Sequence, residues 1–121
     1  METMMKPLAL VVEDDPHLSQ IFMITISEMF ETEAVVNGTQ AIARLSETAP
    51  SLVILDINLP GASGMEVLHF IRTDARFAST RVILATADSR KADELEDKAD
   101  IVLLKPISIT QLREFASRLV V

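Results

Sequence analysis

Residues 8–16, LALVVEDDP, join five consecutive apolar residues to three carboxylates and a proline. A short apolar run without polar alternation is typical of a strand buried on both faces, as in a parallel sheet covered by helices. Pro16 suits the first position of a helix, and Asp15 suits the N-cap before it. The stretch therefore predicts a buried strand, a helix that begins at Pro16, and two acids, Glu13 and Asp14, at the carboxyl end of the strand.

The same pattern recurs along the chain. Further short apolar runs follow at LVIL (52–55), VILA (82–85) and IVLL (101–104), and a weaker run spans 34–36. Segments with apolar residues at helical spacing lie at 16–30, 39–48, 63–73 and 108–119. Strand and helix alternate five times once a fourth helix is placed at 88–98. Right-handed crossovers then predict one open, doubly wound α/β sheet with helices on both faces.

Two of these helices carry local signals. The segment 88–98 is nearly all polar, so its helix should be short or loosely docked. The last helix opens with Ser108 and, three residues on, Gln111, which predicts a capping box.

Composition limits the class of protein. A chain of 121 residues fits one domain with a single core, so we expect residues 1–121 to form one domain without an output domain. The net charge of −7 argues against direct binding to nucleic acid or anionic membranes. The chain has no cysteine, no apolar stretch of membrane-spanning length, and no apolar signal-peptide core in METMMKP. These features predict a cytoplasmic protein.

Polar side chains follow each of the long apolar runs. Asp56 comes directly after the second run, Thr86 after the third and Lys105 after the fourth. In open α/β sheets, ligands bind beyond the carboxyl ends of the strands. We therefore expect these three side chains to meet Glu13 and Asp14 at one edge of the sheet.

Three carboxylates at one edge require protonation or a cation, and a divalent cation is the better solution at pH 7. Like charges about 4 Å apart repel by roughly 4 kcal/mol at an effective dielectric constant near 20. Oxygen ligands favour Mg²⁺, with Mn²⁺ as a substitute, and Mg²⁺ with few protein ligands is commonly completed by phosphate oxygens. Lys105 and Thr86 suit a phosphoryl group as ammonium and hydroxyl donors. Asp56, alone on its strand, is the candidate covalent acceptor.

Four motifs, VVEDDP, LVILDINLPGASGMEVL, VILATAD and LLKPI, occur in an order and at a spacing that resemble the receiver domains of two-component response regulators. The resemblance covers nearly the whole chain. It implies a flavodoxin-like fold with strand order 2-1-3-4-5 and a signalling switch rather than an enzyme. It also implies a cis peptide between Lys105 and Pro106 and places Pro60 and Gly64 in the loop after the acceptor.

The resemblance assigns roles to the same edge residues. Asp56 matches the phospho-acceptor, Glu13 and Asp14 the acidic pair that holds Mg²⁺, and Asn58 the residue whose backbone carbonyl binds the metal. Thr86 matches the switch hydroxyl and Lys105 the phosphate-binding lysine.

Other implied roles concern phosphate lifetime and partners. Asn58 and Asp88 match positions that tune dephosphorylation, although Asp88 reads equally well as a residue at the start of a helix. The implied donor is a phosphohistidine on a histidine kinase or histidine phosphotransfer protein, and the implied target is another protein. No cofactor besides the metal is implied.

Two features depart from the family pattern. Val102 stands where the family usually has an aromatic switch residue, and the chain contains no Tyr. The interval from Thr86 to Lys105 is also a few residues shorter than expected, which trims the fourth helix. The face formed by that helix, the last strand and the last helix therefore lacks the usual switch.

Three alternatives would use a related fold. A flavodoxin needs an uncharged, hydroxyl-rich phosphate loop after its first strand, where this chain has three acids. A haloacid-dehalogenase-like phosphatase needs its nucleophile after the first strand and a cap domain. A phosphorylation-independent scaffold or binding module with the receiver fold remains the alternative to a phospho-accepting receiver.

Overall fold

The structure, a computed structural model, describes residues 6–119. Strands and helices alternate in this part of the chain: β1 (Leu8–Val12), α1 (Pro16–Ile26), β2 (Glu31–Val35), α2 (Gly38–Leu45), β3 (Leu52–Asp56), α3 (Gly64–Thr73), β4 (Arg81–Thr86), α4 (Ser89–Leu95), β5 (Ile101–Leu104) and α5 (Ile109–Leu119). A short 3-10 turn, η1 (Ala75–Phe77), precedes β4. None of the helices between residues 6 and 119 has the length and apolar character needed to cross a membrane.

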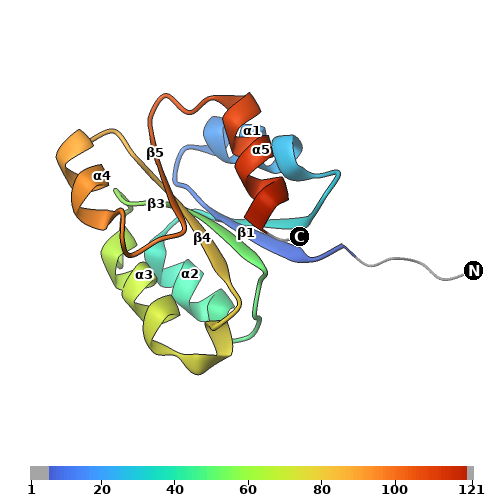
Figure 1. Ribbon diagram of the computed structural model, residues 1–121. Coiled ribbons are helices and arrows are strands. Elements are labelled where there is room, and N and C mark those ends of the chain that lie inside the picture. The colour runs from blue at the N-terminus through green and yellow to red at the C-terminus, as the bar shows by residue number, and fades with distance from the viewer. Residues whose placement is uncertain (1–5, 120–121) are drawn as a thin grey trace, which may run out of the picture.

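The strands form one parallel sheet in the order β2-β1-β3-β4-β5, as expected. Helices α1 and α5 cover one face, and α2, α3 and α4 cover the other (Figure 1). Strand order reverses between β1 and β3, so their carboxyl ends lie at the switch point where such sheets bind ligands.

Successive residues of each central strand enter opposite cores, because side chains alternate across a sheet. In β1, Leu10 and Val12 join the core under α2, α3 and α4, whereas Ala9 and Val11 join the core under α1 and α5. Strands β3 and β4 alternate in the same way, and this explains their continuously apolar sequences.

The helix boundaries follow local hydrogen bonds. Asp15 Oδ1 accepts the backbone N–H groups of His17 and Leu18 at 2.9 and 3.4 Å, so α1 begins at Pro16 as predicted. The helix ends at Ile26 and not at residue 30, because the chain turns there to bury Phe30 before β2. The prediction of a longer first helix was therefore wrong at its carboxyl end.

Two other local predictions were only partly right. Ser108 Oγ accepts the N–H of Gln111 at 3.2 Å, but the hydrogen bonds of residues 6–119 include none returning from the Gln111 side chain. The complete capping box is formed by Ser63 and Glu66 at the start of α3. The weak strand lies at Glu31–Val35 and not at 34–36. It is an edge strand, which tolerates polar residues, and its first three residues are polar, so the apolar pattern did not indicate where it begins.

Helix α4 is short, as its polar sequence predicted, and Leu95 is its buried residue. The connection from α4 to β5 is held by Asp100, whose Oδ2 accepts the N–H of Val82 at 2.7 Å. The same carboxylate pairs with Arg72 of α3 at 3.0 Å and with Arg81 of β4 at 3.3 Å. Burial alone would raise the pKa of Asp100, but the Val82 N–H and the Arg72 guanidinium outweigh it and lower that pKa below the usual value.

Removing the Asp100 carboxylate should destabilise the fold. We expect Asp100→Ala to lower the free energy of unfolding by about 2 kcal/mol at pH 7, because it leaves charge-assisted bonds unmade. A lowered pKa means that this stabilisation is complete above the unfolded value of 3.8 and is lost as pH falls through the folded value. Urea unfolding from pH 7 to pH 3 should show the two proteins converging in acid. Asp93→Ala on the exposed face of α4 serves as the control.

Candidate functional site

Three charged side chains continue the alternation of the strands beyond the core. Glu13 follows Ala9 and Val11 on the α1–α5 face of β1, and Asp56 holds the equivalent place on β3. Lys105 follows Ile101 and Leu103 on that face of β5. The period of two therefore brings these three groups to the same side of the sheet, directly above one hydrophobic core.

The three groups are bonded to one another. Lys105 Nζ donates to Asp56 Oδ2 and to Glu13 Oε1, each at 3.1 Å. The other oxygen of Glu13 accepts the N–H of Asp15 at 3.1 Å. Glu13 and Asp56 are 1% and 4% exposed, so the ammonium is the counter-ion of two buried carboxylates.

Burial and pairing act on the pKa values of Glu13 and Lys105. Desolvation is the main reason that the pKa of Glu13 lies above its usual value, and the nearby charge of Asp56 raises it further. The bonds from Asp15 and Lys105 oppose this rise without cancelling it. Burial disfavours the charged form of Lys105, but its hydrogen bonds to Asp56 and Glu13 raise the pKa of Lys105 above normal.

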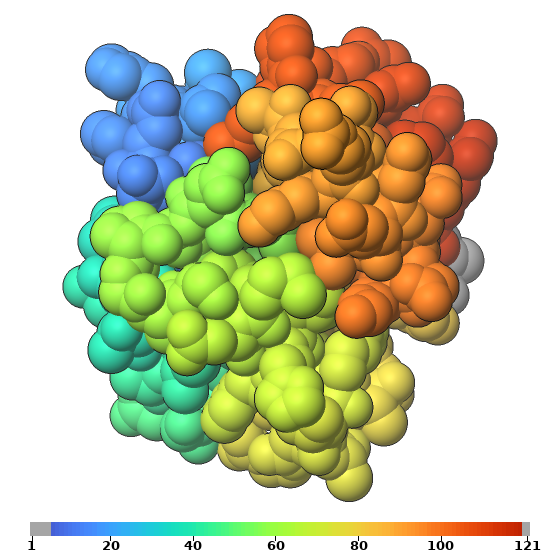
Figure 2. Space-filling model, turned by 90° about the vertical axis from the view of Figure 1, so that its left-hand side faces the viewer, coloured from blue at the N-terminus to red at the C-terminus, as the bar shows by residue number. Residues whose placement is uncertain are grey.

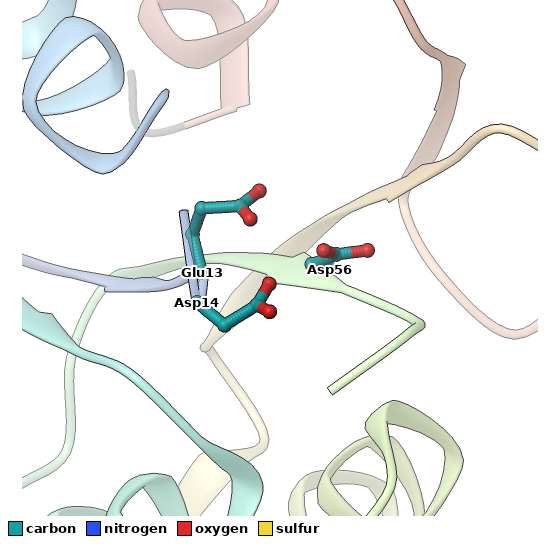
Figure 3. Close-up of side chains that lie close together, drawn as sticks. All are labelled: Glu13, Asp14 and Asp56. Atoms are coloured by element: carbon teal, nitrogen blue, oxygen red, sulfur yellow. The ribbon is translucent and has the colours of Figure 1, made fainter. Parts of the chain in front are cut away.

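Asp14 completes an acidic group with Glu13 and Asp56. One carboxylate oxygen from each of the three lies within 4.8 Å of the others, and Figure 3 shows the side chains at the ends of β1 and β3. Asp14 is exposed, unlike its two partners, so it faces solvent at the mouth of the site. An all-oxygen group with one solvent-facing member fits the ligand preference of Mg²⁺, which keeps several waters.

Asn58 lies beside Asp56. Its backbone N–H donates to Asp56 Oδ1 at 3.1 Å, so both oxygens of Asp56 are engaged, one by Asn58 and one by Lys105. Gly64 packs where a side chain would not fit, because a Cβ there would lie 2.6 Å from the carbonyl oxygen of Asp56. The cis peptide implied between Lys105 and Pro106 is present.

Thr86 is not brought into this cluster. Its side chain is fully buried. Because Thr86 comes two residues after Leu84 on β4, it lies on the same face of the sheet as Leu84, which belongs to the core under α2, α3 and α4. Its hydroxyl oxygen accepts the N–H of Asp88 at 3.1 Å. Asp88 is the N-cap of α4, with Oδ1 accepting from Arg90 and Lys91, which favours the helix-start interpretation of Asp88.

The position of the missing aromatic switch residue is occupied by a small side chain. Val102 is partly buried and packs against the core under α2, α3 and α4. Leu104, two residues on, is 48% exposed on the same edge strand. This edge is apolar at both positions and has no aromatic ring to turn inward.

An apolar groove adjoins the charged cluster at Lys105. It has a volume of about 500 Å³ and lies between α1 and the loop from β5 to α5; its lining is Leu18, Ile21, Phe22, Lys105, Pro106, Ile107 and Ile109. Ile21 and Ile109 are 43% and 39% exposed, which is unusual for large apolar side chains. Because Lys105 belongs both to this lining and to the charged cluster, the groove reaches the lysine that is paired with Asp56.

Comparison with known proteins agrees with this geometry. Residues 9–117 match the family model described as response regulator receiver domain. The signal receiver domain of a putative Luxo repressor protein from Vibrio parahaemolyticus superimposes with a TM-score of 0.86 at 30% identity, over 96% of this chain and 91% of that one. The chemotaxis regulator CheY4 of Vibrio cholerae shares the fold, with a TM-score of 0.84 at 23% identity over 94% of this chain and 98% of that one.

Curated relatives include longer regulators. The DNA-binding response regulator MtrA of Mycolicibacterium smegmatis is 34% identical over 93% of this chain and 49% of its own length. The phosphate regulon transcriptional regulatory protein PhoB of Rhizobium meliloti is 35% identical over 89% and 49%. The chain thus spans about half the length of these relatives. Their names give no support to the expectation of no nucleic-acid partner. The family match, the fold and these relatives together show that the chain belongs to the receiver domains of two-component response regulators, a family of signalling switches.

Proposed function

We propose that Asp56 accepts a phosphoryl group from a phosphohistidine of a partner kinase or phosphotransfer protein. The observation that supports this role is the placement of Asp56. It is a buried carboxylate at the switch point of the sheet, bonded to Lys105 on one side and close to Asp14 on the other. A carboxylate in this setting can act as a nucleophile toward phosphorus, because nearby cations offset the charge of the incoming group.

The transfer exchanges one bond to phosphorus for another. An oxygen of Asp56 forms a bond to phosphorus as the phosphorus–nitrogen bond of the donor breaks. The donor nitrogen keeps the electron pair and leaves as neutral imidazole when the other ring nitrogen carries a proton. Glu13, Asp14, Asp56 and the backbone carbonyl of Asn58 would hold Mg²⁺, which supplies neutralisation of charge on the phosphoryl oxygens.

The response to phosphorylation would begin with Lys105 and Thr86. A phosphoryl group attracts the Lys105 ammonium and the Thr86 hydroxyl as charge-assisted donors. Thr86 now accepts the N–H of Asp88 at the start of α4, so its movement would release a bond at that helix. We expect the resulting change to be read by another protein and to act in the cytoplasm.

The direct test uses a small-molecule phosphodonor. Incubation with acetyl phosphate and Mg²⁺ should add the mass of one phosphoryl group to the intact protein, and chelation of Mg²⁺ should prevent the addition. The absence of an adduct together with the absence of Mg²⁺ binding would instead support the phosphorylation-independent scaffold.

The groove beside Lys105 is the place where we expect the phosphodonor protein to bind. A donor that delivers its phosphohistidine to Asp56 must cover the mouth of the site, and the exposed Ile21 and Ile109 offer apolar contact there. Small-molecule donors need no such contact, so the two kinds of donor separate docking from chemistry.

A charge placed in the groove should therefore slow one reaction and spare the other. We expect Ile21→Glu to reduce phosphotransfer from a phosphorylated histidine phosphotransfer protein about tenfold or more, the effect of losing a central apolar contact. Phosphorylation by acetyl phosphate should stay within about twofold of wild type. Ile24→Glu, on the same helix but outside the groove lining, is the matched control. Equal slowing with both donors would show that Ile21 does not act through docking.

A further inference from the structure

The loop that follows Asp56 is held by backbone hydrogen bonds at both of its ends. We call residues 57–63 the acceptor loop. At its start, Ile57 N–H donates to Ala85 O and Asn58 N–H to Asp56 Oδ1, each at 3.1 Å. At its end, Gly64 N–H donates to Ile57 O at 3.2 Å. These bonds leave the middle of the loop to be held by another part of the chain.

The first turn of α2 holds that middle. Gly38 N–H donates to Pro60 O, and Ala62 N–H donates to Thr39 Oγ1, each at 3.2 Å. Figure 2 shows the start of α2, in teal, against the loop, in green. Two adjacent residues of the helix thus bond residues on both sides of Gly61.

The contact between the two segments is close. A Cβ on Gly38 would lie 1.8 Å from the carbonyl oxygen of Ala62, so the loop can approach the helix only because position 38 carries no side chain. Gly61 has a φ of 74°, which favours glycine, and a Cβ there would lie 2.8 Å from Thr39 Oγ1. The loop therefore has little freedom to move toward the helix.

Helix α2 is a firm support for this contact. Its residues Ala41 and Leu45 are fully buried in the core under α2, α3 and α4. Its N-cap, Asn37, accepts the N–H of Gln40 at 2.7 Å. A group on the first turn of this helix is consequently fixed relative to β3, and a bond from it fixes the loop.

We propose that Thr39 is a positioning residue for the metal site. Its hydroxyl holds the acceptor loop so that Asn58 keeps its place beside Asp56, where the Asn58 carbonyl completes the group formed with Glu13 and Asp14. This inference rests on the proposed function, because it takes Asn58 as a metal ligand. Thr39 touches neither metal nor phosphoryl group and acts through Ala62.

The experiment compares Thr39→Val with Thr39→Ser. Valine keeps the shape and removes the acceptor, whereas serine keeps the hydroxyl. Mg²⁺ affinity is measured by titration, and the amide resonances of Ala62 and Asn58 are followed in metal-free protein. We expect Thr39→Val to weaken Mg²⁺ binding about three- to tenfold, the equivalent of one hydrogen bond, and to shift both amides. Thr39→Ser should stay within about twofold of wild type.

Thr48→Val separates positioning from general stability. It removes a hydroxyl that bonds Arg44 O at the other end of the same helix, so it should alter the melting temperature without changing Mg²⁺ affinity. Wild-type affinity in Thr39→Val, or equal weakening in the Ser and Thr48 variants, would overturn the positioning role and leave the proposed function intact. If the wild type binds no Mg²⁺ at pH 7, both the proposed function and this inference fail.

Discussion

Asp56→Asn should abolish formation of the phosphoryl adduct. The amide that replaces the carboxylate is not a nucleophile toward phosphorus, so the adduct seen with acetyl phosphate and Mg²⁺ should fall below detection by intact mass. The amide oxygen can still accept one of the two bonds now made by Asn58 and Lys105, so the fold should survive. A folded protein without an adduct then isolates the chemistry from the structure.

The control for this variant lies next to the site. Asp15→Asn makes the same chemical change next to Glu13 and Asp14, but Asn caps a helix as well as Asp does. We expect this control to be phosphorylated to the wild-type extent. An adduct that persists in Asp56→Asn would assign the acceptor to another residue, and peptide mapping would identify it.

The fold was predictable because its central strands are buried on both faces. Each such strand is a short apolar run, and each run of the sequence became a strand of the parallel sheet. Strand β2 was placed inaccurately because it lies at the edge, where Glu31 and Glu33 reach solvent or a salt-bridge partner. Burial on one side leaves a weaker pattern in the sequence than burial on both.

The site was predictable to the level of which strand ends meet. It was less predictable which residues at the strand ends share a face of the sheet. This depends on the exact position of each residue in its strand, because successive side chains point to opposite faces. Glu13, Asp56 and Lys105 lie on the face of the sheet that α1 and α5 cover, and they are bonded together. Thr86 lies on the opposite face, and its hydroxyl accepts the N–H of Asp88. The expected approach of this hydroxyl to the phosphoryl group therefore requires a movement from its present position.

Contacts between loops were not predictable from the sequence. The bond from Ala62 to Thr39 joins residues 23 apart whose side chains have no shared pattern. The ion pairs of Asp100 with Arg72 and Arg81 likewise depend on how α3, β4 and the loop before β5 pack. The one sequence signal for this contact is the pair Asn37-Gly38, because Asn-Gly marks a turn. The pair does not indicate which segment packs against Gly38.

Lys105→Met should destabilise the metal-free protein more than the other substitutions considered above. The change leaves Glu13 and Asp56 buried without their counter-ion, and breaking a buried pair in this way costs about 3 kcal/mol. The measurement is urea unfolding at pH 7 without Mg²⁺. Methionine keeps the length and apolar stem of the side chain, so the loss reports the charge.

A second substitution identifies the source of that loss. In the double variant Lys105→Met with Glu13→Gln, one of the unpaired charges is gone, and we expect part of the stability to return. Glutamine also keeps an oxygen that can accept the N–H of Asp15. If the double variant is no more stable than Lys105→Met, the loss does not come from the charge on Glu13.

The pH dependence gives the same test without a second substitution. Burial raises the pKa of Glu13, so Glu13 takes up a proton in the folded state at a higher pH than in the unfolded state. Once Glu13 is protonated, Lys105 faces one negative charge fewer. The loss in free energy of unfolding caused by Lys105→Met should therefore be complete near pH 8 and become smaller in acid. A deficit independent of pH would mean that desolvation of the ammonium offsets its attraction to Glu13. With the expected dependence, Lys105 is the cation that balances this site before phosphorylation. When the Lys105 ammonium moves to the phosphoryl group, Glu13 would need another cation. The switch would therefore depend on bound Mg²⁺.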